Sequence, residues 1–419
     1  MMSISRPDRR QFLQVASATL AAPAFLRIRS ARAASPIRIG LVSPKTGPLA
    51  FFGEPDDFVI SQFQSVFAAG AGGRPIELIV KDSQSSAARA ADVASELILR
   101  DEVSLILSAG GPDTVNPVAD QAEVNGIPSI STACPWQPFM LGRGSTPEKG
   151  FESTFLFGFG LEDLIAAYLK LWSGLETNRK VGLLLPNDAD GNAWGDAAFG
   201  FPPALKAAGY EAVDPGRYTP MAEDFSAQIS AFQSAGVDIV MGTMVPPEFL
   251  TFWAQAAQKG LKPKIATIGK CLLLPATLDA LGTSGDRLST ELAWHPAYPF
   301  TSATTGQTAA EIASAWTAAT GRPWVQTVGL KHALLDLAVD VLKRAEDAGD
   351  PEAVIAAIRA TNTQTTLGTA NWAASPIANV ARAGVMGGQW HRDGQSYGIE
   401  IAANPTDLPI PVTQPLQPL

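Results

Sequence analysis

Short apolar runs alternate with longer helical patterns along the chain from residue 37 onward. Four apolar runs rich in β-branched residues come first, at residues 37–42, 76–80, 103–107 and 127–130. Between the later runs the apolar positions recur at helical spacing, as at Val93, Leu97 and Ile98. This alternation predicts βαβ units, that is, a parallel sheet with helices on both faces. The runs lack strict two-residue alternation, which is typical of strands buried on both faces.

Two irregular stretches interrupt this rhythm, at residues 135–159 and 294–305. Between them the pattern predicts strands at 181–185, 237–242 and 265–268 and helices at 161–172, 194–208 and 247–259. A helical series follows at 309–319, 329–345 and 351–361. The sequence therefore predicts two similar α/β halves joined through the irregular stretches. The tail from Asn404 has five prolines in sixteen residues, and we expect it to be a surface strap or disordered.

The first 33 residues differ from the rest of the chain. A basic pair, Arg9-Arg10, is followed directly by an uncharged run over residues 11–26, and residues 31–33 read Ala-Arg-Ala. The uncharged run is shorter than the roughly 20 residues that a membrane span needs. The segment resembles a twin-arginine export signal with cleavage after Ala33, which predicts a periplasmic protein. The alternatives are an uncleaved amphipathic anchor or a cytosolic helix.

The length and the net charge of the chain further limit the class of protein that it can be. The chain has 419 residues, which suits two domains. Six arginines and one aspartate lie in the first 33 residues, so the remainder holds 25 basic and 39 acidic residues, a net charge of −14. An acidic body offers no electrostatic surface for nucleic acid, and we expect no such partner.

The sequence has few of the residues and motifs that an enzyme or a metal site would need. The chain has three histidines and two cysteines, Cys134 and Cys271, and it lacks a GxSxG elbow, a P-loop and a dinucleotide fingerprint. Residues 188–192 read DADGN, but Ala193 and Phe199 stand where a calcium-binding EF-hand loop needs Gly and Glu. We therefore expect no enzyme, metal site or cofactor.

Several segments that follow predicted strands resemble, in order, the leucine/isoleucine/valine-type periplasmic solute-binding proteins of ABC importers. They are residues 39–50 (IGLVSPKTGPLA) with Gly53-Glu54 after them, 81–84 (KDSQ), 126–128 (GIP) leading into Ser131-Thr132, and 180–183 (KVGL) leading into Asp190-Gly191. The resemblance implies the type 1 periplasmic binding protein fold, with two Rossmann-like α/β lobes that have parallel sheets and are joined by three hinge crossovers. By this resemblance lobe 1 comprises residues 34–155 and 296–361, and lobe 2 comprises residues 156–295 and 362–419.

The resemblance also implies a function. A small solute is closed between the lobes and delivered to an ABC permease and its ATPase subunits at the inner membrane, after export by the twin-arginine machinery, and we expect a monomer. One alternative is a ligand-sensing receptor that works without transport, and a weaker one is an exported hydrolase.

Positions that contact the solute in this family can be carried over to the present sequence. They fall on or near Phe52, Gly111, Asp113, Thr114, Ser131, Thr132, Ala133, Asp190 and Trp194, and on Lys270 or Cys271. Trp136 and Trp294 are added because they lie near the expected crossovers, where their rings can supply apolar walls.

Three departures from the family pattern bear on the solute. Pro112 and Pro135 stand where a hydroxyl is expected, and Lys270 or Cys271 stands where an acid would meet an α-ammonium group. A free Lys270 would bind a carboxylate through charge-assisted hydrogen bonds. The sequence therefore suggests an organic or aromatic acid, although the family default is an amino acid. Because Cys134 and Cys271 are expected in opposite lobes, we predict free thiols.

Overall fold

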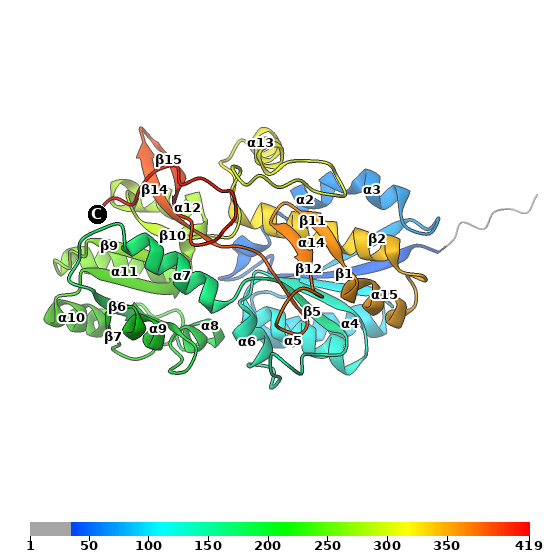
Figure 1. Ribbon diagram of the computed structural model, residues 1–419, viewed down its shortest axis with the longest axis horizontal. Helices are drawn as coiled ribbons and strands as arrows, with labels where there is room; N and C mark the ends of the chain where they lie inside the picture. Colours follow the sequence, from blue (N-terminus) through cyan, green and yellow to red (C-terminus); the bar gives the residue numbers. More distant parts are fainter. Residues whose placement is uncertain (1–34) are drawn as a thin grey trace, which may run out of the picture. The chain divides into compact units, whose positions relative to one another are not determined.

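The computed structural model describes residues 35–419 (Figure 1). A six-stranded parallel sheet forms the centre of the first of its two halves. The strand order is β13-β5-β4-β3-β1-β2. The strands are β1 (Ile37–Ser43), β2 (Ile76–Asp82), β3 (Leu105–Ala109), β4 (Ser129–Thr132), β5 (Thr154–Gly158) and β13 (Val380–Arg382). The predicted export signal at residues 1–33 lies outside the described residues.

A second sheet has seven strands in the order β15-β14-β10-β9-β8-β6-β7. Its parallel strands are β6 (Lys180–Leu184), β7 (Glu211–Val213), β8 (Ile239–Met244), β9 (Ile265–Lys270) and β10 (Ser289–Leu292). The antiparallel hairpin of β14 (Met386–Asp393) and β15 (Ser396–Ala403) completes it at the β10 edge. We call the first sheet with its helices lobe 1, and the second sheet with its helices lobe 2.

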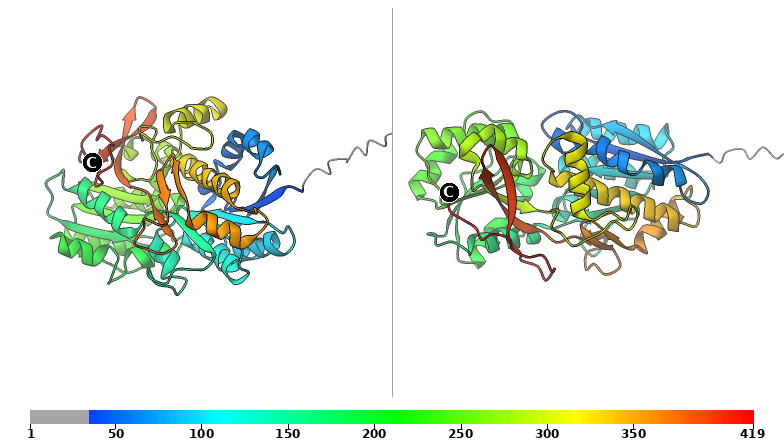
Figure 2. Two further views of the ribbon diagram at one scale, coloured as in Figure 1. Left: turned by 45° about the vertical axis from the view of Figure 1, so that its right-hand side comes forward. Right: turned by 90° about the horizontal axis from the view of Figure 1, so that it is seen from above.

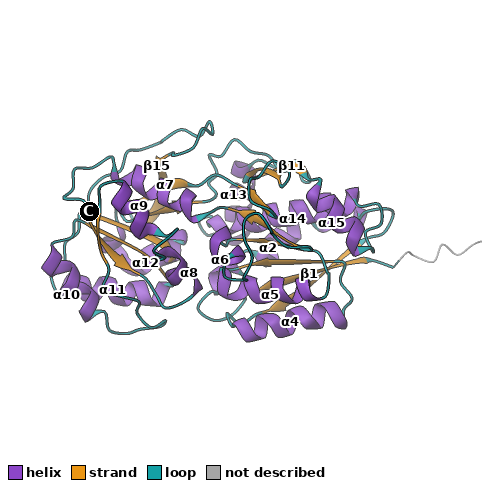
Figure 3. Ribbon diagram, turned by 60° about the horizontal axis from the view of Figure 1, so that its bottom comes forward, coloured by secondary structure: helices purple, strands orange, loops and turns teal. Residues whose placement is uncertain are grey.

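Helices cover both faces of the first sheet (Figure 3). Lobe 1 has α2 (Asp56–Gln62), α3 (Gln64–Ala69), α4 (Ala87–Leu99), α5 (Pro112–Val124), α6 (Trp136–Met140), α13 (Ala309–Thr320), α14 (Gln326–Arg344) and α15 (Pro351–Arg359), with the 3-10 turn η1 (Ala50–Phe52). Neighbouring β1 residues belong to different apolar clusters: Leu41 packs in the same cluster as Leu334 of α14, whereas Val42 packs with Leu97 of α4. This arrangement explains why β1 shows no two-residue alternation in the sequence.

Lobe 2 has its own set of helices. They are α7 (Leu161–Trp172), α8 (Ala189–Trp194), α9 (Phe201–Ala207), α10 (Ser226–Ala235), α11 (Pro246–Gln258) and α12 (Pro275–Leu281), with 3-10 turns η2 (Cys271–Leu273) and η3 (Gly282–Gly285). At the start of α8 the Asp188 side chain accepts a hydrogen bond from Gly191 N at 2.7 Å, which fixes where this helix begins. Across residues 35–419, none of the helices combines the length and apolar character that crossing a membrane requires.

The chain passes between the two sheets three times. The crossings lie between β5 and α7, between β10 and α13, and between β13 and β14. The third differs from the expected change of lobe at residue 362, because residues 362–371 form a separate hairpin, β11 (Asn362–Thr365) with β12 (Gly368–Asn371), and β13 then pairs with β5 in lobe 1. A strand of three residues such as β13 leaves too short a pattern for sequence reasoning to detect.

The tail after β15 forms a strap along lobe 2. Ile410 and Leu416 are buried, Thr413 N donates to Ile401 O at 2.9 Å, and Leu419 N donates to Lys264 O at 2.9 Å. Figure 2 shows this segment in dark red beside the β14–β15 hairpin. Of the two alternatives that the prolines allowed, the structure shows the strap.

Candidate functional site

A cavity lies between the lobes and is lined by residues of both. From lobe 1 and the first crossing come Phe52, Gly111, Ala133, Pro135, Phe159, Gln326 and Leu330. Lobe 2 and the start of the second crossing contribute Leu164, Asp190, Trp194, Thr243, Lys270, Leu273, Glu291 and Ala293. The cavity has a volume of about 40 Å³. That is room for a few water molecules, and it is less than the ~150 Å³ of an apolar cavity that holds one benzene ring. A solute of amino-acid or aromatic-acid size therefore requires the lobes to separate or a wall side chain to move.

The part of the cavity wall that lobe 1 contributes consists of apolar side chains and backbone atoms. Phe52 packs against Phe51 with ring centroids 4.4 Å apart. Gly111 caps α5 with a φ of 81°, and a Cβ added to it would lie 3.6 Å from Asp190 Oδ2 across the cavity. Ala133 follows β4 with a φ of 57°, a conformation rare outside glycine. Lys270 at the end of β9 has a φ of 61°, so each lobe brings one backbone outlier to the cavity.

The lobe 2 wall holds an ion cluster. Lys270 Nζ lies 2.7 Å from Asp190 Oδ2 and 3.5 Å from Asp188 Oδ2. Lys270 and Asp190 both line the cavity, but they are paired with each other. The anionic solute expected from the sequence assumed an unpaired Lys270, and the structure removes that assumption.

Burial and charge both shift the pKa values of this cluster. For Lys270 the burial opposes the charged form, but the nearby charges of Asp190 and Asp188 outweigh it and raise its pKa. Burial raises the pKa of Asp190 to about 6, with Lys270 acting in the opposite direction. Burial and then the charge of Asp188 raise the pKa of Asp113. At neutral pH Lys270 and Asp190 are therefore both ionised.

Asp113 contacts the opposite lobe instead of lining the cavity. Its Oδ1 accepts a hydrogen bond from Ala189 N, at the start of α8, at 3.4 Å. Asp113 stands in the first turn of α5, so two helix starts, one from each lobe, meet at this contact. The contact joins the lobes at the edge of the cavity.

The predicted hydroxyl residues Thr114, Ser131 and Thr132 do not line the cavity. Thr114 Oγ1 donates to Gly110 O at 2.9 Å within its own helix start. The hydroxyls of Ser131 and Ser108 lie 2.9 Å apart between neighbouring strands. Thr132 is buried, and it is not among the residues that line the cavity. These side chains support the sheet behind the cavity wall.

Two of the predicted tryptophans also pack elsewhere. Trp136 Nε1 donates to both carboxylate oxygens of Glu162, at 2.9 and 3.1 Å, next to the first crossing. Trp294 is fully buried and lies edge-on to Trp324 at 5.6 Å. A Cβ added to Gly329 would lie 2.1 Å from Trp294, so the ring fills the space that this glycine leaves on α14. Both tryptophans stabilise the crossings.

Sequence reasoning missed the polar residues inside two lobe 2 strands. Thr243 of β8 is the register partner of Gly269 in β9. Ser289 pairs with Thr267, so Glu291, two residues further along β10, comes level with Gly269. Both Thr243 and Glu291 line the cavity. Thr243 directly follows the strand predicted at residues 237–242, but its residue type alone did not mark it as a site residue. Glu291 lies within a strand and not in a loop after one; its signal was an acid between Leu288 and Leu292.

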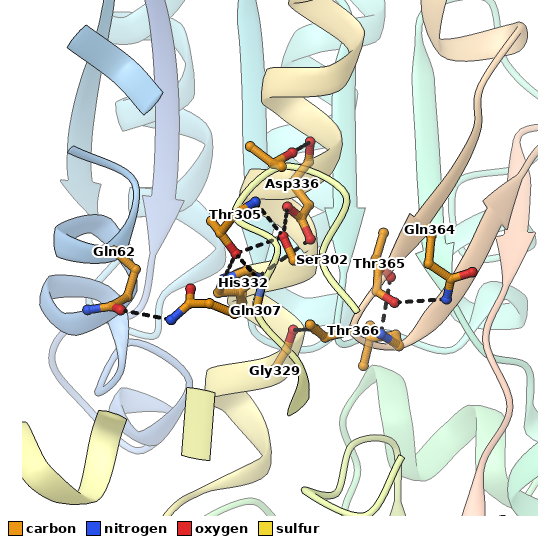
Figure 4. A network of polar contacts seen from close by, with 12 residues as sticks. Gln62, Ser302, Thr305, Gln307, Gly329, His332, Asp336, Gln364, Thr365 and Thr366 are labelled. Atoms are coloured by element: carbon orange, nitrogen blue, oxygen red, sulfur yellow. Dashed lines mark hydrogen bonds and ion pairs between the residues drawn. The ribbon is translucent and has the colours of Figure 1, made fainter. Parts of the chain in front are cut away.

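A buried Ser–His–Asp group lies in lobe 1 (Figure 4). Ser302 Oγ donates to Asp336 Oδ1 at 2.6 Å, and His332 Nδ1 lies 3.6 Å from Asp336 Oδ2. His332 Nε2 faces Thr305 Oγ1 at 3.4 Å. The serine hydroxyl is bonded to the acid instead of the imidazole, and His332 and Asp336 are fully buried, so this is not a hydrolase triad. The group fixes the second crossing to α14, while Gln307 Nε2 reaches Gln62 Oε1 at 3.3 Å.

The cysteines are two free buried thiols, as predicted. Cys134 follows β4 of lobe 1 and Cys271 follows β9 of lobe 2. Burial, reinforced by nearby acids, raises both thiol pKa values well above the ordinary value, which disfavours the nucleophilic thiolate. Within residues 35–419, no group of three or more His, Cys, Asp and Glu side chains is placed to hold a metal ion.

Residues 36–395 match the sequence pattern of the periplasmic binding protein family, and the chain belongs to that family. Its two mainly parallel sheets form the type 1 periplasmic binding protein fold, and the family consists of binding proteins and not of enzymes.

Solved structures of other solute-binding proteins share this fold. The leucine-binding protein LivK from Thermotoga maritima is 20% identical with a TM-score of 0.73, over 89% of this chain and 100% of that chain. An ABC-transporter solute-binding protein from Rhodopseudomonas palustris BisB5, solved with 3,4-dihydroxybenzoic acid, is 20% identical with a TM-score of 0.71, over 90% of this chain and 99% of that chain. At these identities the likeness shows the fold alone.

A curated relative is similar in sequence. The Leu/Ile/Val-binding protein homolog 3 of Brucella melitensis is 26% identical over 206 residues, which is 49% of this chain and 53% of that protein. The match thus spans about half the length of this relative.

Proposed function

We propose that this protein is the extracytoplasmic solute-binding component of an ABC importer, which captures a small solute between its lobes and delivers it to a membrane permease and its ATPase. The observation that carries the proposal is the cavity itself, since residues of both lobes line it and the chain crosses between the lobes three times. Closure about such crossings is a common way for two-lobed proteins to enclose a ligand.

The charges of the wall favour an amino-acid-type solute over a simple organic anion. Lys270 is neutralised by Asp190 and Asp188 within its own lobe, so a carboxylate would have to compete for it. Glu291 lines the same cavity, and no salt bridge to it is present in the described part of the chain. An aromatic acid, which the paired Lys270 no longer favours, becomes the second choice.

The proposal includes export. The Arg9-Arg10 pair and the Ala31-Arg32-Ala33 stretch support a twin-arginine signal removed after Ala33, and hence a periplasmic protein. We also expect a monomer. Amino-terminal sequencing of the protein from the periplasmic fraction should begin at Ala34. A protein that keeps residues 1–33, or that stays in the cytoplasm when the twin-arginine pathway is intact, contradicts this part.

Solute capture is tested with the purified protein. Small molecules released by denaturing it are identified by mass spectrometry, and a panel of L-amino acids, hydroxybenzoates and short carboxylates is screened by thermal shift. We expect one or more amino acids to raise Tm and uptake of that amino acid to fall when the gene is deleted. Stabilisation by hydroxybenzoates alone would reverse the order of the two solute classes.

A further inference from the structure

Glu291 is a buried carboxylate in the wall of the cavity. It lies within β10 with 6% of its surface exposed. A Cβ added to Gly269 on the neighbouring strand would lie 3.1 and 3.2 Å from the two carboxylate oxygens of Glu291 and 2.9 Å from Trp194 Cη2. The absence of a side chain at Gly269 therefore gives the Glu291 carboxylate room to lie over β9, beside Trp194 and toward the cavity.

Within residues 35–419, the hydrogen bonds that the Glu291 carboxylate accepts all go to one of its two oxygens. Oε2 accepts from Tyr168 Oη at 2.7 Å and from Thr290 Oγ1 at 3.0 Å. Burial, and then the charge of Glu291, raise the pKa of Tyr168 well above its ordinary value, so this phenol stays protonated and donates. Within residues 35–419, no hydrogen bond to Oε1 is present.

Two other buried acids within residues 35–419 face a lysine. Asp56 Oδ1 lies 2.8 Å from Lys331 Nζ, and Asp190 has Lys270. Glu248, a second buried glutamate that accepts a tyrosine hydroxyl in lobe 2, receives three hydrogen bonds shared between both of its oxygens, from Tyr218 Oη, Met221 N and Val245 N. For Glu291 no Lys, Arg or His nitrogen lies within 4.0 Å in the part of the chain that the structure describes.

A buried carboxylate without a counter-charge is costly, and a positively charged donor removes that cost. A neutral hydroxyl or amide would satisfy the oxygen but leave the charge uncompensated. A second acceptor stands in the same wall, because Thr243 Oγ1 is buried and has no hydrogen-bond partner among residues 35–419.

We propose that Glu291 is the specificity-determining residue of the cavity, and that it selects solutes carrying a protonated amine by accepting a hydrogen bond from that amine at Oε1. This inference rests on the proposed solute-binding function and names the group that the solute must carry. Tyr168 positions the carboxylate from α7, and the Lys270 cluster leaves Glu291 as the unmatched charge of the wall.

The test compares the wild-type protein with Glu291→Gln, which keeps the size and one acceptor but removes the charge. Glu248→Gln is the matched control, since Glu248 is also buried and tyrosine-bonded in lobe 2 but does not line the cavity. Affinities are measured by calorimetry for each L-amino acid that raises Tm, for its 2-hydroxy acid, and for 4-hydroxybenzoate. Tm of each variant reports whether it folds.

We expect the wild type to prefer the amino acid over its 2-hydroxy acid by about tenfold or more. Glu291→Gln should weaken amino-acid binding by roughly 30-fold or more and remove most of that preference, as expected for truncating a desolvated charge pair. Glu248→Gln should retain the preference. A merely structural role of Glu291 would lower Tm and weaken both solutes alike.

Three outcomes overturn the inference, and they differ in what they say about the proposed function. If Glu291→Gln keeps the wild-type affinity and preference, Glu291 does not select the solute, while solute capture stands. If the wild type binds 4-hydroxybenzoate or other amine-free acids alone, capture stands but both the amine and the amino-acid class are wrong. If the wild type binds no compound tested, the proposed amino-acid function fails together with the inference.

Discussion

The ammonium nitrogen of Lys270 lies 2.7 Å from Oδ2 of Asp190, and both residues belong to lobe 2. The sequence predicted that Lys270 would bind the carboxylate of a solute, but its charge is matched by Asp190 within one wall of the cavity. The pair forms because β9 ends at Lys270 and α8 begins at Ala189, and parallel strands and the helices that follow them bring such ends to one edge of a sheet.

Breaking this pair from one side should destabilise the protein. Lys270→Met leaves Asp190 and Asp188 without their cation, and we expect the free energy of unfolding to fall by about 3–5 kcal/mol. The double variant Lys270→Met with Asp190→Asn should recover much of this loss, because it leaves no unpaired charge at the 2.7 Å contact. Urea denaturation of the wild type, the two single variants and the double variant gives the coupling energy. Strictly additive losses would mean that the two side chains act independently.

Asp190 should impose a pH dependence on stability. Its pKa is raised from the ordinary 3.8 to about 6 by burial, so between pH 4 and 6 the folded state holds a proton that the unfolded state has lost. This group therefore makes the free energy of unfolding decrease as pH rises through that window, by at most about 3 kcal/mol, with no further change above it.

The pH effect is isolated by subtracting Asp190→Asn. The stability of the wild type minus that of the variant should fall between pH 4 and 6 and stay level from pH 6.5 to 8, measured by urea denaturation at each pH. Other carboxylates, such as Asp82, whose pKa is lowered in the folded state, contribute the opposite slope and cancel in the difference. A difference that rises with pH would contradict the raised pKa.

Gly269→Ala tests how closely the wall is packed. The added methyl group would lie 2.9 Å from Trp194 Cη2 and 3.1 Å from Glu291 Oε1, so one of these side chains must shift. We expect a stability loss of about 1–3 kcal/mol and a clear loss of solute affinity, measured by denaturation and calorimetry. Gly398→Ala on β15, where no atom would lie within 4 Å of the new Cβ, is the control and should change neither. Unchanged affinity in Gly269→Ala would mean that the solute does not use this part of the wall.

The thiols give a chemical check on the two lobes. Cys134 and Cys271 are fully buried and free, so a thiol reagent should find none in the native protein and two per chain after denaturation without reductant. Two thiols that react in the native state at the rate of exposed cysteine would contradict their burial. Two thiols missing after denaturation would indicate a disulfide.

The lobes and most strands were predictable because buried parallel strands and their helices leave a strong pattern. Strand-end loops also pointed to the right edge of the sheets: Phe52, Gly111, Ala133, Asp190 and Lys270 all line the cavity. Loops after parallel strands gather at one edge whatever their residues are, so topology alone places them.

What the sequence did not predict depends on side-chain direction and on long-range pairing. Ser131 lies at the correct strand end, yet its hydroxyl turns toward Ser108 inside the sheet. The Lys270–Asp190 pair joins residues 80 positions apart, and no local pattern reports it. Glu291 lies inside a strand of four residues, and its importance depends on the empty space above Gly269.

The hydrogen bond from Ala189 N to Asp113 Oδ1 bears on the kinetics of solute exchange. At 3.4 Å it is long. Within the described residues, the other hydrogen bonds between the lobes lie near the ends of the crossings, such as those of Gln326 with Glu291 O and Ala293 N, both at 2.9 Å. The Lys270 ion pair stays intact when the lobes part, because it lies within one of them. At this edge of the cavity, opening therefore breaks a single long hydrogen bond, and it should proceed at the microsecond-to-millisecond rates of hinge motion. The residence time of a bound solute is then governed by the bonds that the solute itself makes to the two walls.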